Sequence, residues 1–196
     1  MPNRWDQSAV FLQSGDPEKE NVVSLSYPGQ LGTRFTVIAK GPAASVYSAG
    51  MPTPAAGRAK TYQLVQTDSS AATAPFPNAV AWWSDKTKYL VTTSASKTGR
   101  GRVAGRFPDN GAGGSIGPGN YGCIQTYGTG FVRLINGPTA TPDATGKFIV
   151  PSATDGLADC IAAGTASTYP VMGYSSGVFD AANVQVLVDL DVPNTP

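Results

Sequence analysis

Two stretches of the sequence carry residue patterns known from catalytic or phosphate-binding sites. Ser94-Ala-Ser-Lys97 has the Ser-x-x-Lys spacing in which a lysine assists a serine nucleophile in acyl transfer. That chemistry needs the serine at the start of a helix, whereas here it follows a predicted strand. Residues 109–120 are rich in glycine, but neither a lysine nor a helix follows to complete a phosphate-binding loop. We therefore interpret the first pattern as chance and the second as a flexible surface loop.

Paired carboxylates and paired tryptophans are the other candidates for chemistry. Asp189 and Asp191 lie two residues apart on a predicted strand, so they share a face. Such pairs serve glycoside hydrolysis or bind a hard cation, but without further acidic ligands nearby a solvated strand face is favoured. Trp82 and Trp83 are adjacent, so one is expected to point into the core and the other outward, where it could stack on a sugar. A carbohydrate-binding module is therefore an alternative function, and an enzyme using carboxylates alone is a weaker one.

The sequence contains no histidine, although glycine and proline occupy 23 and 16 of its 196 positions. Without histidine, Ser-His-Asp triads, Cys-His dyads and histidine-containing metal sites are excluded. Cys123 and Cys160 lack the close spacing of a metal or redox pair, and we interpret them as small buried residues, with a disulfide left open. We expect a protein with no cofactor, no metal and no enzymatic activity.

The elements that must position these residues are strands, since alternation with a period of two is common and helical periodicity is nearly absent. In the clearest run, residues 183–191, Val184, Val186, Val188 and Leu190 share one face. Further strands are predicted at residues 34–39, 60–67, 79–84, 88–93, 102–105, 121–127, 130–136, 147–150, 156–162 and 171–174. About ten short strands separated by turn signals predict an all-β fold, a single antiparallel β-sandwich or barrel domain.

Turns and loops divide the chain further. Hairpins are predicted around residues 84–87 and around Gly128-Thr129-Gly130, where glycine allows a positive φ. Residues 1–30 are interpreted as an extended N-terminal arm, and residues 31–196 as the β-domain with a long loop at 41–59. No run of apolar residues reaches the length of a signal peptide or a membrane span, so we expect folding in a cytoplasm and no membrane partner.

Charge is sparse and unevenly distributed. Charged residues make up 14% of the chain against a typical share of about 25%, and the net charge of +1 predicts no nucleic-acid partner. Lys86 to Arg106 holds six bases and no acid, whereas five acids and no base follow Phe148. These stretches are either two solvated faces of one domain or complementary surfaces that meet between subunits.

Several short motifs, in this order, resemble a family of small virion proteins of tailed phages. They are Pro28-Gly-Gln-Leu-Gly32, Thr61-Tyr-Gln-Leu-Val-Gln66, Ala81-Trp-Trp-Ser-Asp85, Tyr89-Leu-Val-Thr92, Arg102-Val-Ala-Gly105, Pro118-Gly-Asn-Tyr-Gly-Cys-Ile-Gln125, Gly146-Lys-Phe-Ile-Val-Pro151, Val171-Met-Gly173 and Val188-Asp-Leu-Asp-Val-Pro193. The resemblance covers most of residues 28–193. It implies a capsid decoration (cement) protein that binds the major capsid protein on the outside of the virion, often as a homotrimer, and reinforces the shell.

An extended arm could attach such a protein by adding a strand to the edge of a neighbouring sheet. We predict that residues 1–30 do this with apolar anchors, and that the basic stretch supplies further contacts. The predicted capsid or intersubunit contacts are Trp5, Phe11, Leu12, Lys97, Arg100, Arg102 and Arg106.

Overall fold

The computed structural model describes residues 12, 16–25, 30–38, 59–70, 73–96, 103–109 and 114–192. Within these ranges the chain forms eleven strands and the short 3-10 turn η2 (Lys86–Lys88), which confirms the all-β prediction. The strands are β1 (Asn21–Val22), β2 (Arg34–Ile38), β3 (Ala59–Thr67), β4 (Val80–Asp85), β5 (Leu90–Thr92), β6 (Val103–Arg106), β7 (Tyr121–Arg133), β8 (Thr145–Pro151), β9 (Ala158–Ile161), β10 (Gly173–Asp180) and β11 (Gln185–Asp191). The described part of the chain has no helix long and apolar enough to cross a bilayer.

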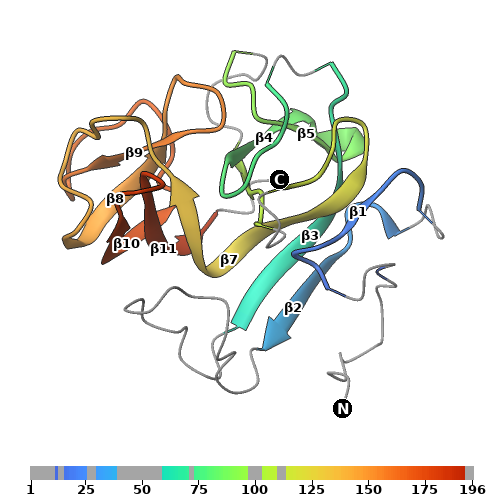
Figure 1. The fold of residues 1–196 in the computed structure, drawn as a ribbon, viewed down its shortest axis with the longest axis horizontal. Helices are drawn as coiled ribbons and strands as arrows, with labels where there is room; N and C mark the ends of the chain where they lie inside the picture. The colour runs from blue at the N-terminus through green and yellow to red at the C-terminus, as the bar shows by residue number, and fades with distance from the viewer. Residues whose placement is uncertain are drawn as a thin grey trace.

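Five strands close into a ring, here called the barrel, in the order β3-β5-β4-β6-β7 with β7 returning to β3 (Figure 1). All its pairs are antiparallel except β3 with β5, which run parallel. The predicted turn between β4 and β5 is confirmed. Asp85 begins it by accepting the backbone N–H of Thr87, and Tyr89 ends it in the left-handed region with φ 54°.

Strand β7 takes part in both halves of one continuous sheet and runs between the two halves of the molecule in Figure 1. Residues 121–127 pair with β3, whereas residues 127–133 pair with β11. Gly128, with φ +88°, lies where the partner changes, and an added Cβ there would be 2.3 Å from the carbonyl oxygen of Ala59. The hairpin predicted around residues 128–130 is therefore wrong. The glycine bends a continuous strand at a close backbone approach instead of reversing the chain.

The second half, here called the C-terminal sheet, has the strand order β7-β11-β10-β8-β9. It curls back on itself, because Leu134 forms a bridge with Ala158 of β9 and the Ile135 N–H donates to the Ala158 carbonyl at 2.8 Å. The predicted inward face of β11 is confirmed for Val186, Val188 and Leu190, which are all buried, whereas Val184 precedes the strand at φ 50° and is only partly buried.

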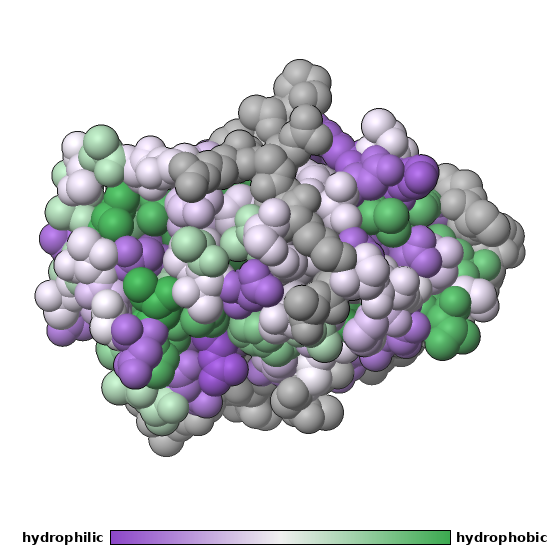
Figure 2. All heavy atoms as spheres, turned by 90° about the horizontal axis from the view of Figure 1, so that it is seen from above, coloured by the Kyte–Doolittle hydropathy of each residue, from purple (hydrophilic) through white to green (hydrophobic). Residues whose placement is uncertain are grey.

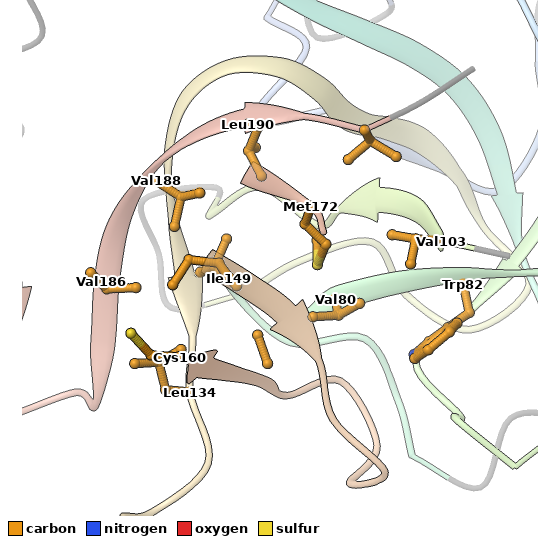
Figure 3. Packing of buried hydrophobic residues seen from close by; sticks show 13 residues of the cluster. Val80, Trp82, Val103, Leu134, Ile149, Cys160, Met172, Val186, Val188 and Leu190 are labelled. Carbon is orange, nitrogen blue, oxygen red and sulfur yellow. The ribbon is translucent and has the colours of Figure 1, made fainter. Parts of the chain in front are cut away.

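The main hydrophobic cluster joins the barrel to the C-terminal sheet (Figure 3). It consists of Val80, Trp82, Val103, Val132, Leu134, Ile149, Ala158, Cys160, Met172, Val186, Val188, Leu190 and Val192. A second cluster, which includes Trp83 and Phe107, packs on the other side of β4. Strand β4 is thus covered on both faces, and Trp82 and Trp83 are 0% and 8% exposed. The prediction that one of the two tryptophans points outward is wrong.

The N-terminal segment is partly built into this domain. Strand β1 pairs with β7, with Asn21 opposite Gly122, and the Asn21 Oδ1 accepts the backbone N–H of Gly117. Glu20 is buried, and Leu12 packs against the cluster of Tyr62, Leu64 and Cys123. Residues 16–25 therefore belong to the β-domain and not to a separate arm. The predicted loop at 41–59 lies outside the described residues apart from Ala59.

Two smaller predictions are also resolved. Cys123 and Cys160 are free thiols in the buried interior, which confirms their interpretation as small core residues. The glycine-rich stretch 109–120 is not simply a surface loop, since Ile116 is 3% exposed and packs in the second cluster.

Candidate functional site

The structure changes the set of predicted contact residues. Arg106, expected on a basic surface, is 4% exposed and lies inside the domain, so the prediction that it contacts a partner is wrong. Leu12 is partly buried against the chain's own core. The remaining five predicted contacts lie outside the described residues. They are Trp5, Phe11, Lys97, Arg100 and Arg102.

Arg106 ends β6 at the centre of a buried polar cluster, here called the Arg106 network (Glu18, Asn78, Arg106, Gln125 and Gln185). Its Nε donates to the Gln125 Oε1 at 2.9 Å, and its NH1 donates to the Asn78 Oδ1 at 2.7 Å. The Gln125 amide in turn donates to the carbonyls of residues 127–129 at 3.0 to 3.1 Å. The guanidinium therefore tethers β6 to the bend in β7.

Glu18 connects this network to the N-terminal segment. Its Oε1 accepts the Tyr62 hydroxyl at 2.6 Å and the Lys60 Nζ at 3.0 Å, and lies 3.8 Å from the Arg106 NH2. Burial raises the pKa of Glu18, but the charges of Lys60 and Arg106 and the Tyr62 hydrogen bond outweigh it and lower the pKa below its ordinary value. Burial, and then the Glu18 charge, raise the pKa of Tyr62 well above its ordinary value, so the phenol remains a donor.

The network also reaches the C-terminal sheet. The Asn78 Nδ2 donates to the Gln185 Oε1 at 2.9 Å, and the Gln185 Nε2 donates to the Asp180 Oδ2 at 2.9 Å. Gly130 makes room for the guanidinium, because a Cβ there would be 2.3 Å from the Arg106 Nε. A chain of polar contacts thus runs from residue 18 through the barrel to β10 and β11. These contacts hold the N-terminal segment, the barrel and the C-terminal sheet together.

Asn78 and Gln125 were not singled out from the sequence. Asn78 has φ 63°, a conformation that asparagine tolerates better than most residues, but nothing in its neighbourhood marks Arg106 as its partner. The alternation of residues 121–127 indicates a buried strand without indicating that Gln125 would be 0% exposed. Only closure of the barrel brings the three side chains together.

The other predicted sites also have clear positions. Ser94 is buried and its hydroxyl lies 3.0 Å from that of Ser96, while Lys97 falls outside the described residues. Within the described ranges there is no group of three or more metal-ligating side chains. Asp189 and Asp191 are exposed on one face of β11, where Thr129 and Tyr127 of β7 lie opposite them.

Hydrophobic residues on the face shown in Figure 2 form separate patches among hydrophilic and intermediate ones. The described residues with large exposed hydrophobic side chains are Val23, Tyr127 and Tyr174. Two of these three, both tyrosines, line one hollow on the C-terminal sheet.

Comparisons of this chain with protein families, with curated proteins and with solved structures found no match.

Proposed function

We propose that this chain is a structural virion protein that binds the outer surface of a tailed-phage capsid and reinforces the shell without catalysis. The observation that carries the proposal is that residues 16–25, here called the base of the N-terminal segment, are held to the β-domain. Strand β1 pairs with β7, and Glu18 makes contacts with Lys60, Tyr62 and Arg106. The sequence directly before this base contains Trp5 and Phe11, the apolar anchors proposed for the major capsid protein.

The interior supports a mechanical role. The two sheets share one continuous strand, and one hydrophobic cluster and one polar network cross from the barrel to the C-terminal sheet. Close-packed interiors of this kind deform little and transmit strain. A protein that braces a shell needs this property, because it must carry load from one capsid contact to another.

Charge supports association between copies. Arg106 is buried, and the sequence between β5 and β6 also contains the basic residues Lys97, Arg100 and Arg102. The acids that follow Phe148 include Asp159 and Asp180, which are partly exposed on the C-terminal sheet and lie outside the hollow lined by Tyr127 and Tyr174. Complementary charge of this kind sets the register between subunits, and we propose a homotrimer on the capsid exterior.

Deletion of residues 2–11 tests the attachment, because it leaves Leu12, Glu18 and β1 in place. Undecorated capsids of the cognate phage are mixed with the purified chain and sedimented, and bound protein is measured. We expect the deletion and the double variant Trp5→Ala/Phe11→Ala to lose binding, while Asp143→Asn, at an exposed site outside the network, binds normally. Unchanged binding by the deletion variant would contradict the proposed role of the N-terminal segment.

The oligomer is tested separately by sedimentation equilibrium, where we expect three copies of the 20.2 kDa chain. Arg100→Ser/Arg102→Ser should shift the protein toward monomer, and high salt should act in the same direction. A monomer at all concentrations would refute the trimer and leave the capsid assay interpretable.

A further inference from the structure

A hollow of about 550 Å³ lies over the C-terminal part of β7 and over β10 and β11. Its lining includes Tyr127, Thr129, Tyr174, Asp189 and Asp191, and we call it the tyrosine hollow. Tyr127 and Tyr174 are 51% and 49% exposed, and among the described residues only Val23 is another exposed large hydrophobic side chain. Exposed aromatic rings that converge on one depression are typical of a binding site.

Strand register explains why these five residues meet. Tyr127 lies opposite Asp191, and Thr129 lies opposite Asp189, which in turn lies opposite Tyr174 of β10. Residues directly opposite in antiparallel strands carry their side chains on the same face. The five side chains therefore form one surface, opposite to the buried face of Val186, Val188 and Leu190.

The lining is chemically specific and partly preorganised. The Tyr174 ring packs edge-on against Phe148 with the centroids 5.5 Å apart, which limits its motion. Thr129 is 4% exposed, and its Oγ1 has no hydrogen-bond partner within the described chain. A buried hydroxyl left in this way costs free energy unless a ligand or water bonds to it. The hollow thus combines two ring faces, carboxylate acceptors and one unsatisfied hydroxyl.

We propose that the tyrosine hollow binds a neutral saccharide. A sugar ring presents an apolar C–H face, which stacks on a tyrosine ring, and a rim of hydroxyls, which donate to carboxylates and exchange hydrogen bonds with Thr129. The two carboxylates repel sialic and uronic acids, so the site selects uncharged sugars. This site is distinct from the buried pair Trp82 and Trp83, and it does not depend on attachment to a capsid.

A cationic side chain is the other ligand that aromatic rings and carboxylates accept. Two observations favour a sugar. Asp189 already takes part in an interaction within the chain. The Thr129 hydroxyl both donates and accepts, as a sugar hydroxyl does, whereas a guanidinium or ammonium group has no acceptor to offer.

The test is a printed array of neutral, amino and sialylated oligosaccharides probed with the purified full-length chain, followed by calorimetric titration with the strongest binder in solution. We expect binding to neutral glycans and not to sialylated ones. Tyr127→Ala and Tyr174→Ala should each weaken binding by about tenfold or more, since each removes one stacking ring. Tyr127→Phe should retain binding, and Asp191→Asn should weaken it.

Two control variants carry comparable changes outside the hollow. Val23→Ala removes the third exposed hydrophobic side chain, and Asp143→Asn neutralises an exposed carboxylate, so both should bind as the wild type does. Urea midpoints check that each variant is folded. The proposal is overturned if no neutral glycan binds, if both alanine variants bind normally, or if an oligo-arginine peptide binds through the tyrosines and glycans do not.

Discussion

Replacement of Arg106 by methionine tests whether the Arg106 network holds the domain together. The change keeps an unbranched side chain but shortens it, and it removes all donors to Gln125 and Asn78, which are 0% and 5% exposed. Each buried acceptor left without a donor costs about 1–3 kcal/mol. The ion pair with Glu18 adds little, because at 3.8 Å and with the Glu18 side chain 33% exposed it is weak and partly screened.

The two acceptors together cost about 2–6 kcal/mol, and removal of a buried charge offsets part of this. We therefore expect a loss of about 3 kcal/mol in the free energy of unfolding, which lowers the urea midpoint by about 1–2 M. Tryptophan fluorescence and far-UV circular dichroism follow the transition. The control is Arg133→Met, whose partly exposed guanidinium donates from Nε to the Asn183 carbonyl at 3.1 Å, and it should cost less than about 1 kcal/mol.

A double-mutant cycle with Gly130→Ala sharpens the test. The new Cβ would lie 2.3 Å from the Arg106 Nε, so Gly130→Ala should destabilise the wild type strongly, and less so when the flexible methionine replaces arginine. Gly146→Ala is the control, because a Cβ added there would meet no other atom. It should lower the free energy of unfolding by only about 1 kcal/mol, from backbone strain at φ +74°. If Arg106→Met and Arg133→Met have equal midpoints, or if the Gly130 and Arg106 changes are additive, the network does not have the proposed role.

Three further outcomes are expected. Because the Glu18 pKa is lowered in the folded state, its contribution to stability is complete above the ordinary value of about 4.3 and is lost as the pH falls through the folded-state value. The gap in urea midpoint between wild type and Glu18→Gln should therefore narrow from about pH 6 to pH 3; a constant gap would contradict this. In a Trp5→Phe background, Trp82 and Trp83 should resist acrylamide quenching, and efficient quenching would show that one is exposed. Both cysteines are buried and burial raises the pKa of each thiol, so Ellman's reagent should react only after denaturation, and fast native labelling would refute their burial.

The elements that could be predicted from the sequence are those marked by a short run of consecutive residues. The alternation at residues 183–191 predicted both β11 and its buried face, and the polar stretch 84–87 predicted the turn after β4. The same reasoning failed at Gly128-Thr129-Gly130, since glycines that permit a hairpin equally permit a bend in one long strand. The difference depends on whether β3 and β11 are available as successive partners, and this is a property of the whole sheet.

Burial of charged and aromatic residues was the least predictable feature. Arg106 ends the short strand β6 in a basic stretch. Its charge is tolerated in the interior only because Asn78, in the turn before β4, and Gln125, opposite it on β7, supply acceptors. Of the tyrosine hollow, Asp189 and Asp191 were recognised as sharing a face. Tyr127 and Thr129 alternate with glycines along β7, which indicates a second face but not that β11 lies beside it.

The arrangement of the two sheets determines where surface chemistry can occur. Strands β4 and β6 carry buried side chains along nearly their whole length, because the barrel interior lies on one side and the C-terminal sheet on the other. Even two adjacent tryptophans therefore leave no ring on the surface at β4. In the C-terminal sheet, by contrast, the last part of β11 has exposed Asp189 and Asp191 on either side of buried Leu190, so the outer face there remains open to ligands. Binding chemistry is consequently expected on the outer face of β7, β11 and β10, where Tyr127 and Tyr174 lie, while the barrel supplies the rigid support behind it.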